Sequence, residues 1–169
     1  MSRVHWARFW RSGRCGARAQ SICAGRVEAM ETLRRPVAPR DCDILGHMNV
    51  AAYIEAVSDA MFGIQTAAGL DRGALAATQR SFVAAHIAAD YRAEMLAGEV
   101  FTINSHVLHV GTKSARFGHR MTRLSDGATV FQAENVSVFF DLMTRRAVAI
   151  PDDLRHALNR LREAQPDET

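Results

Sequence analysis

The feature that most constrains the fold is one long helical pattern that is apolar around most of its circumference. From Val50 to Ile64, apolar side chains recur at the i, i+3, i+4, i+7 spacing of a helix face, and alanines fill most of the remaining positions. The pattern predicts a helix that Gly69 ends, with Gly73 in the loop that follows. Because a helix this apolar is stable only when it is covered, the rest of the chain must wrap it.

Strand patterns with a period of two follow the helix and can supply that cover. The predicted strands span residues 82–91, 100–110, 114–124 and 130–142. Two prolines within residues 32–40 suit an edge strand or an extended lead-in, and Pro151 opens a short terminal helix. The order predicts an α+β fold, with one long helix packed against an antiparallel sheet.

The positive charge of the chain is confined to its first residues. The net charge is +3, but residues 1–29 contain six arginines and one acid, so residues 30–169 carry a net charge of −2. We interpret residues 1–29 as a disordered or mis-assigned extension before Met30; an arginine-rich, acid-poor start is also typical of an organellar transit peptide. Residues 30–169 then form a single domain, and no nucleic-acid partner is predicted.

Cysteine usage and hydropathy bear on the compartment. The three cysteines, Cys15, Cys23 and Cys42, form no CxxC pair, which gives no support for a zinc site or a disulfide framework. No run approaches the roughly 18 uninterrupted apolar residues of a membrane helix. These observations predict a soluble, cytoplasmic protein without a membrane partner.

The segment from Asp41 to Asn49, just before the helix, gathers the groups that can do chemistry. It contains carboxylates, the imidazole of His47 and the carboxamide of Asn49. The first amides of a helix have no intrahelical partners, so they can serve an anion or a polarised carbonyl. Structural roles are equally open at this stage, because Asp43 with Gly46 fits a β-turn and Asn49 is a good N-cap.

Four motifs in sequence order resemble the hotdog-fold acyl-CoA thioesterases, and in particular the 4-hydroxybenzoyl-CoA thioesterase-like group. They are Asp43-x-x-Gly46-His47-Met48-Asn49-x-x-x-Tyr53, Asp90-Tyr91-Arg92 before Gly98, Gly111-Thr112-Lys113-Ser114, and Ala149-Ile150-Pro151. The resemblance covers residues 32–162. It implies a hotdog fold, in which a curved antiparallel sheet wraps the long helix, and a homodimer or homotetramer with active sites at a subunit interface.

The resemblance also implies a role for each matching residue. Asp43 would be the catalytic general base or nucleophile, and an amide near Asn49 and Val50 would polarise the thioester carbonyl. The expected catalytic residues are Asp43, His47 and Asn49, and the expected substrate-binding residues are Gly46, Val50, Lys113 and Ser114. Lys113-Ser114 would meet the coenzyme A phosphates. The chain differs from the aryl-CoA enzymes at two places: His47 stands in place of an apolar residue, and Gly111-Thr112 stands in place of basic ones. These differences favour a general or aliphatic acyl-CoA as the expected substrate.

The implied reaction is hydrolysis of an acyl-CoA thioester to free acid and CoA. The leaving thiol has a pKa of about 8.5 and departs readily, so no metal or organic cofactor is required. Two alternatives stay open: a non-catalytic acyl-binding protein of the same fold, and a hotdog enoyl-CoA hydratase. The hydratase is disfavoured because the chain lacks the Asn-Pro step that those enzymes place before the histidine.

Overall fold

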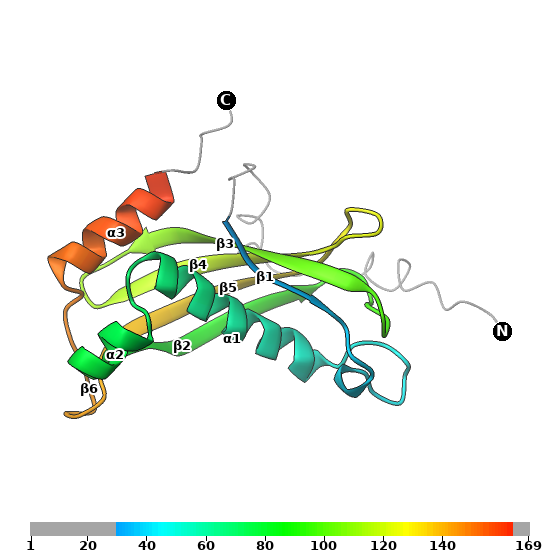
Figure 1. Ribbon diagram of the computed structural model, residues 1–169, viewed down its shortest axis with the longest axis horizontal. Coiled ribbons are helices and arrows are strands. Elements are labelled where there is room, and N and C mark those ends of the chain that lie inside the picture. Colours follow the sequence, from blue (N-terminus) through cyan, green and yellow to red (C-terminus); the bar gives the residue numbers. More distant parts are fainter. Residues whose placement is uncertain (1–29, 164–169) are drawn as a thin grey trace, which may run out of the picture.

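The computed structural model describes residues 30–163 (Figure 1). Its elements are β1 (Met30–Pro36), the 3-10 turn η3 (Pro39–Asp41), α1 (Val50–Ala67), α2 (Arg72–Thr78), β2 (Arg80–Tyr91), β3 (Val100–Val110), β4 (Ser114–Arg123), β5 (Thr129–Asp141), β6 (Arg146–Ala147) and α3 (Asp152–Glu163). The predictions for the N-terminal extension, including Cys15 and Cys23, lie outside the described residues. None of the helices in the described part is long and apolar enough to cross a bilayer.

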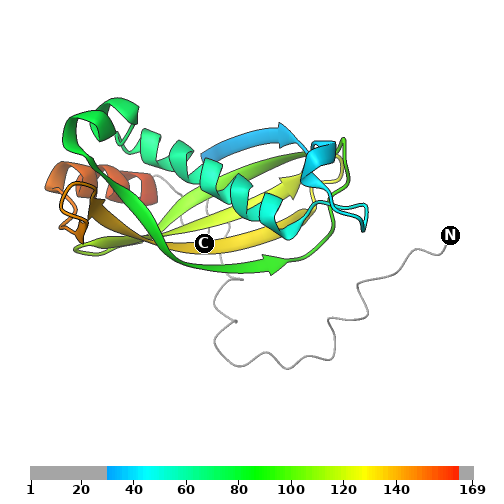
Figure 2. The same ribbon diagram turned by 90° about the horizontal axis from the view of Figure 1, so that it is seen from below.

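The strands form one antiparallel sheet in the order β1-β3-β4-β5-β2, with β6 added beside β5. β1 is an edge strand, as the prolines predict, and pairs with β3 from Met30↔Ser105 to Pro36↔Val100. β2 does not pair with β3, its neighbour in sequence; it lies at the opposite edge, against β5. Figure 2 shows α1 lying along one face of the curved sheet. The predicted α+β hotdog fold is confirmed.

The helix boundaries explain how the chain enters and leaves α1. The predicted start at Val50 is confirmed, and Gly69 follows the helix with a φ of 88°, which favours glycine. The prediction that Gly73 lies in a loop is wrong, because Gly73 is part of α2. The side chain of Asp71 accepts a hydrogen bond from the Ala74 amide at 2.8 Å, and this N-cap offsets the low helix propensity of glycine.

The inner face of the sheet carries two apolar clusters with polar side chains between them. One cluster includes Phe101, Ile103 and Phe131, and the other includes Phe117 and Phe139. The clusters bury one face of α1, which includes Tyr53, Val57 and Ile64, whereas Val50 and Phe62 are mostly exposed. This burial provides the largest favourable term for folding.

A buried hydrogen-bonded chain crosses the sheet between the two clusters. His119 is 2% exposed and its Nδ1 lies 2.8 Å from the Ser105 Oγ, which is in turn 2.6 Å from the Thr32 Oγ1. The His119 Nε2 is buried without a partner among the described residues. Burial, together with the nearby His106, lowers the pKa of His119 to about 3, so the imidazole is neutral in the folded protein.

Candidate active site

The loop between η3 and α1 is closed on itself and fastened to the sheet. Cys42 and Met48 form an isolated antiparallel bridge, and the Asp43 amide donates to the His47 carbonyl at 3.1 Å. The Met48 amide donates to the Met95 carbonyl at 2.7 Å, in the segment that follows β2. These bonds place the loop at the end of β2 where Tyr91 lies.

Tyr53 of α1 fastens the start of the helix to the same region. Its ring packs edge-on against Tyr91 at 5.3 Å between centroids and also contacts Phe131. The hydroxyl donates to the Ala93 carbonyl at 3.4 Å. Burial raises the pKa of Tyr53 to about 12, so the phenol stays protonated and remains a donor at neutral pH.

Asp43 makes the turn that its sequence suggests and also contacts Asn49. The Gly46 amide donates to the Asp43 carbonyl at 3.0 Å, and Gly46 has a φ of 85°. The Asp43 Oδ1 accepts from the Leu45 amide at 2.9 Å, and Oδ2 accepts from the Asn49 Nδ2 at 3.1 Å. The half-buried carboxylate is thus held at both oxygens, while the turn beside it is open to solvent.

Asn49 is the N-cap of α1 and leaves one helix-start amide free. Its Oδ1 accepts from the Ala51 amide at 2.8 Å, and its own amide donates to the Asp41 carbonyl at 2.7 Å. The Ala52 amide donates to the Asn49 carbonyl. Among residues 30–163 the Val50 amide has no acceptor, so it is the donor that a substrate carbonyl can use.

The ring of His47 is not bonded to Asp43. In the part of the chain that the structure describes, its one hydrogen bond is a long one of 3.4 Å between Nδ1 and the Met48 carbonyl. The backbone of His47 does close the turn, through its carbonyl and the Asp43 amide. His47 is half-buried, and its Nε2 has no hydrogen-bond partner among residues 30–163, so it can contact a ligand.

Lys113 and Ser114 lie at the other end of the sheet from Asp43. The Phe139 amide donates to the Lys113 carbonyl at 2.8 Å, and Phe139 pairs with Phe82 near the start of β2. In Figure 1 the β3–β4 turn that holds Lys113 and the loop before α1 stand at opposite ends of the molecule. One chain therefore brings together Asp43, Asn49 and Val50, but not Lys113 and Ser114.

Two charged residues that sequence reasoning did not select stand at the base of the loop. Arg35 of β1 donates from Nη1 to the Asp41 Oδ2 at 2.6 Å. The sequence offers no signal for this contact, because the two residues are separated by prolines at positions 36 and 39 that turn the chain. Within residues 30–163, no cluster of three or more His, Cys, Asp or Glu side chains is placed to hold a metal ion.

Comparison with known families gives a match over most of the domain. The sequence profile of the thioesterase-like superfamily matches residues 37–158, which include the loop, α1 and all of β2 to β5. The chain belongs to the thioesterase-like superfamily. The predicted resemblance to the 4-hydroxybenzoyl-CoA thioesterase-like group of hotdog proteins is confirmed.

Curated relatives of this superfamily member include two named thioesterases. The L-carnitine dehydrogenase/betainyl-CoA thioesterase of Agrobacterium fabrum is 32% identical over 141 residues, which span 81% of this chain and 28% of that protein. The long-chain acyl-CoA thioesterase FadM of Escherichia coli is 27% identical over 120 residues, 70% of this chain and 89% of FadM. Among solved structures, SAV2348 of Staphylococcus aureus, determined in complex with CoA, has a TM-score of 0.76 at 20% identity, and the match covers 86% of this chain and 89% of SAV2348.

Proposed function

We propose that the protein hydrolyses acyl-CoA thioesters to a free acid and CoA. The observation that carries the proposal is the 3.1 Å contact from the Asn49 Nδ2 to the Asp43 carboxylate. The next residue, Val50, has a helix-start amide with no acceptor within residues 30–163. A positioned carboxylate and a free amide are the two parts that thioester hydrolysis needs. The names of the two curated relatives support the same reaction.

Each group has a defined task in this mechanism. The Val50 amide donates to the thioester carbonyl oxygen, and it stabilises the negative charge that forms there by about 3–4 kcal/mol. Asp43 either deprotonates a water molecule that attacks the carbonyl carbon, or attacks it directly to form a mixed anhydride that water then cleaves. The CoA thiolate leaves and takes up a proton. Asn49 orients Asp43, and His47 contacts the carbonyl or the water.

The substrate class follows from the residues beside Asp43. Ile44 is fully exposed and Leu45 is 68% exposed, so the turn presents apolar side chains next to the carboxylate. The aryl-CoA enzymes that the chain resembles have an apolar residue at the position of His47. Together with the name of FadM, these features support a general or aliphatic acyl-CoA substrate over an aryl-CoA.

A homodimer formed through β2 would complete the site. β2 is a twelve-residue edge strand whose residues are mostly exposed, with Val83 at 43% and Ile87 at 36%, and α1 packs mainly against β1 and β3. A long apolar edge is a template for pairing with a second copy. A two-fold axis would run the partner strand antiparallel, so the partner's Lys113 would approach Asp43. In this dimer, Asp43 and the partner's Lys113 would belong to one site, although the two residues lie far apart within one chain.

The reaction is tested with the purified chain and a panel of acyl-CoAs of increasing length, together with benzoyl-CoA. Release of free thiol, followed with a chromogenic disulfide, is the expected result, with the highest kcat/KM on an aliphatic member. Binding of acyl-CoA without thiol release would favour the acyl-binding alternative. Hydration of an enoyl-CoA without thiol release would favour the hydratase.

Replacing Ile87 by lysine should separate the dimer and lower thiol release. A charge in the middle of each paired edge repels its symmetry mate, so we expect a monomer in sedimentation and a kcat/KM lower by about tenfold or more. Leu108→Lys on β3 is the matched control, since Leu108 is 38% exposed but lies away from the β2 edge, and it should remain a fully active dimer. A dimer that persists with Ile87→Lys would place the interface elsewhere.

A further inference from the structure

A buried ion pair lies at the base of the catalytic loop and has no task in the reaction described above. The Asp41 side chain is 6% exposed and that of Arg35 is 21% exposed. The Asp41 Oδ2 accepts from the Arg35 Nη1 at 2.6 Å and from the Ala38 amide at 3.0 Å. The Arg35 guanidinium also lies 5.4 Å from the centre of the Phe101 ring. Both charges are therefore fixed in position by other groups.

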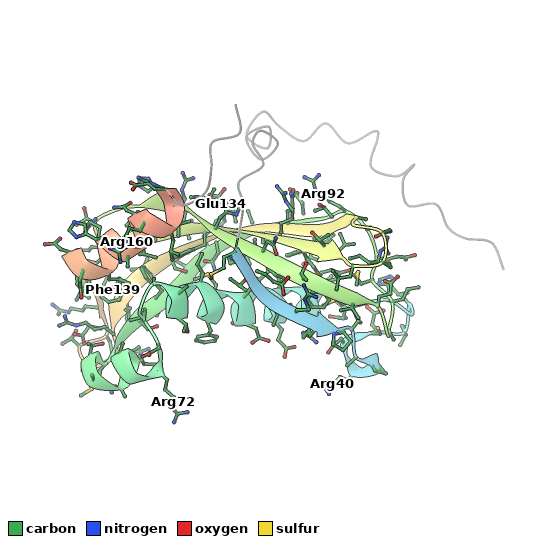
Figure 3. The ribbon with its side chains drawn as sticks, turned by 45° about the horizontal axis from the view of Figure 1, so that its top comes forward. Arg40, Arg72, Arg92, Glu134, Phe139 and Arg160 are labelled. Carbon is green, nitrogen blue, oxygen red and sulfur yellow. The ribbon has the colours of Figure 1, made fainter. Side chains whose placement is uncertain are left out.

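Arg35 is the main counter-charge of Asp41. Burial acts to raise the pKa of Asp41, but the Ala38 amide and Arg35 outweigh it, so the pKa lies below its usual value and the group is ionised at neutral pH. Arg40 contributes less, because its Nε is 4.0 Å away and its side chain is 86% exposed. Figure 3 shows Arg40 extending away from the molecule just after β1.

A short hydrogen-bonded path joins this pair to Asp43. The Asp41 carbonyl accepts from the Asn49 amide at 2.7 Å, and the Asn49 Nδ2 donates to the Asp43 Oδ2 at 3.1 Å. Asn49 is also the residue directly before the free Val50 amide. Asp41 is thus linked through Asn49 both to the carboxylate of Asp43 and to the start of the helix.

We propose that Arg35 and Asp41 are positioning residues for thioester hydrolysis, holding Asn49 so that Asp43 faces the carbonyl bound at the Val50 amide. This inference rests on the proposed function. The tip of the loop is exposed, and the pair at its base adds a restraint on the Asn49 side to the Cys42–Met48 bridge and the bond from the Met48 amide to the Met95 carbonyl. Misplacement of a catalytic group by about 1 Å can cost about 100-fold in rate.

The test compares two arginines of the same strand. Arg35→Gln leaves Asp41 buried without its counter-charge, and should lower kcat about 10- to 100-fold while KM changes less than about threefold. Arg35→Lys keeps the charge and should recover part of the loss. Arg34→Gln is the matched control, because Arg34 makes a similarly short ion pair with Glu31, 2.7 Å, on the exposed surface, and it should keep the parent kcat.

A second variant, Asp41→Asn, and the parent chain distinguish failure of the positioning role from failure of the proposed function. Asp41→Asn, which retains an acceptor for the Ala38 amide, should give the same loss of kcat and covers the case in which Arg35→Gln fails to fold. If the parent chain releases thiol but both variants keep its kcat, the positioning role is wrong and the proposed function stands. Lower thermal stability and an altered KM, with kcat unchanged, would also overturn the positioning role. If the parent chain releases no thiol, the proposed function fails and this inference fails with it.

Discussion

Asp43→Asn should reduce thiol release from acyl-CoA by about 1,000-fold or more, because the carboxamide can neither accept a proton from water nor attack the carbonyl. The substitution keeps an oxygen to accept from the Leu45 amide, so the turn is expected to persist. The new side-chain NH₂ group would either face the Asn49 Nδ2, which is also a donor, or require one of the two side chains to rotate. The measurement is kcat on the best acyl-CoA of the panel, with circular dichroism to confirm the fold.

Asp59→Asn is the matched control for this experiment. Asp59 lies on the exposed face of α1, well away from the loop that holds Asp43, and its replacement by asparagine removes the same charge. Its kcat should equal that of the parent chain. If Asp43→Asn retained the parent rate, the catalytic assignment of Asp43 would be wrong, and the contact with Asn49 would serve only to cap the turn.

Periodicity predicted the elements of this fold well, because it reports which face of an element is buried. The start of α1 at Val50 and both ends of β3 are confirmed, since a helix cap and a change from period 3.6 to period 2 are local features. Pairing is not local. Alternation in β2 marks its two faces but not its neighbour, so the sequence did not reveal that β2 lies against β5 at the far edge.

The candidate site also combines local features, which the sequence predicts, with contacts that depend on the fold. The polar segment before α1 could be selected from sequence, because turn and cap residues act within a few positions of one another. That Asn49 contacts Asp43 depends on the closure of the loop, and that Arg35 reaches Asp41 depends on the path of the chain after β1. Lys113 was correctly placed in a turn, yet its distance from Asp43 depends on the topology of the sheet.

The buried imidazole of His119 should make the protein sensitive to mild acid. Its pKa is about 3 in the folded chain, against 6.5 for the ordinary value, because burial disfavours the charged form. Below pH 6.5 the unfolded chain therefore binds a proton that the folded chain does not. The contribution is fully present above about pH 6.5 and is lost as the pH falls towards 3, by about 1.4 kcal/mol per pH unit.

Urea unfolding at pH 7.5 and pH 5.0, at one protein concentration, measures this loss. We expect about 2 kcal/mol lower stability at pH 5.0 in the parent chain, and a smaller difference in His119→Gln, which cannot titrate. His106 should also lower the stability in acid, because burial lowers its pKa as well. The pKa of Asp41 is lowered too, so its carboxylate is protonated only at more acidic pH. His156→Gln on the exposed face of α3 should leave the pH dependence unchanged. An equal loss in the parent and His119→Gln would show that His119 does not cause the acid sensitivity.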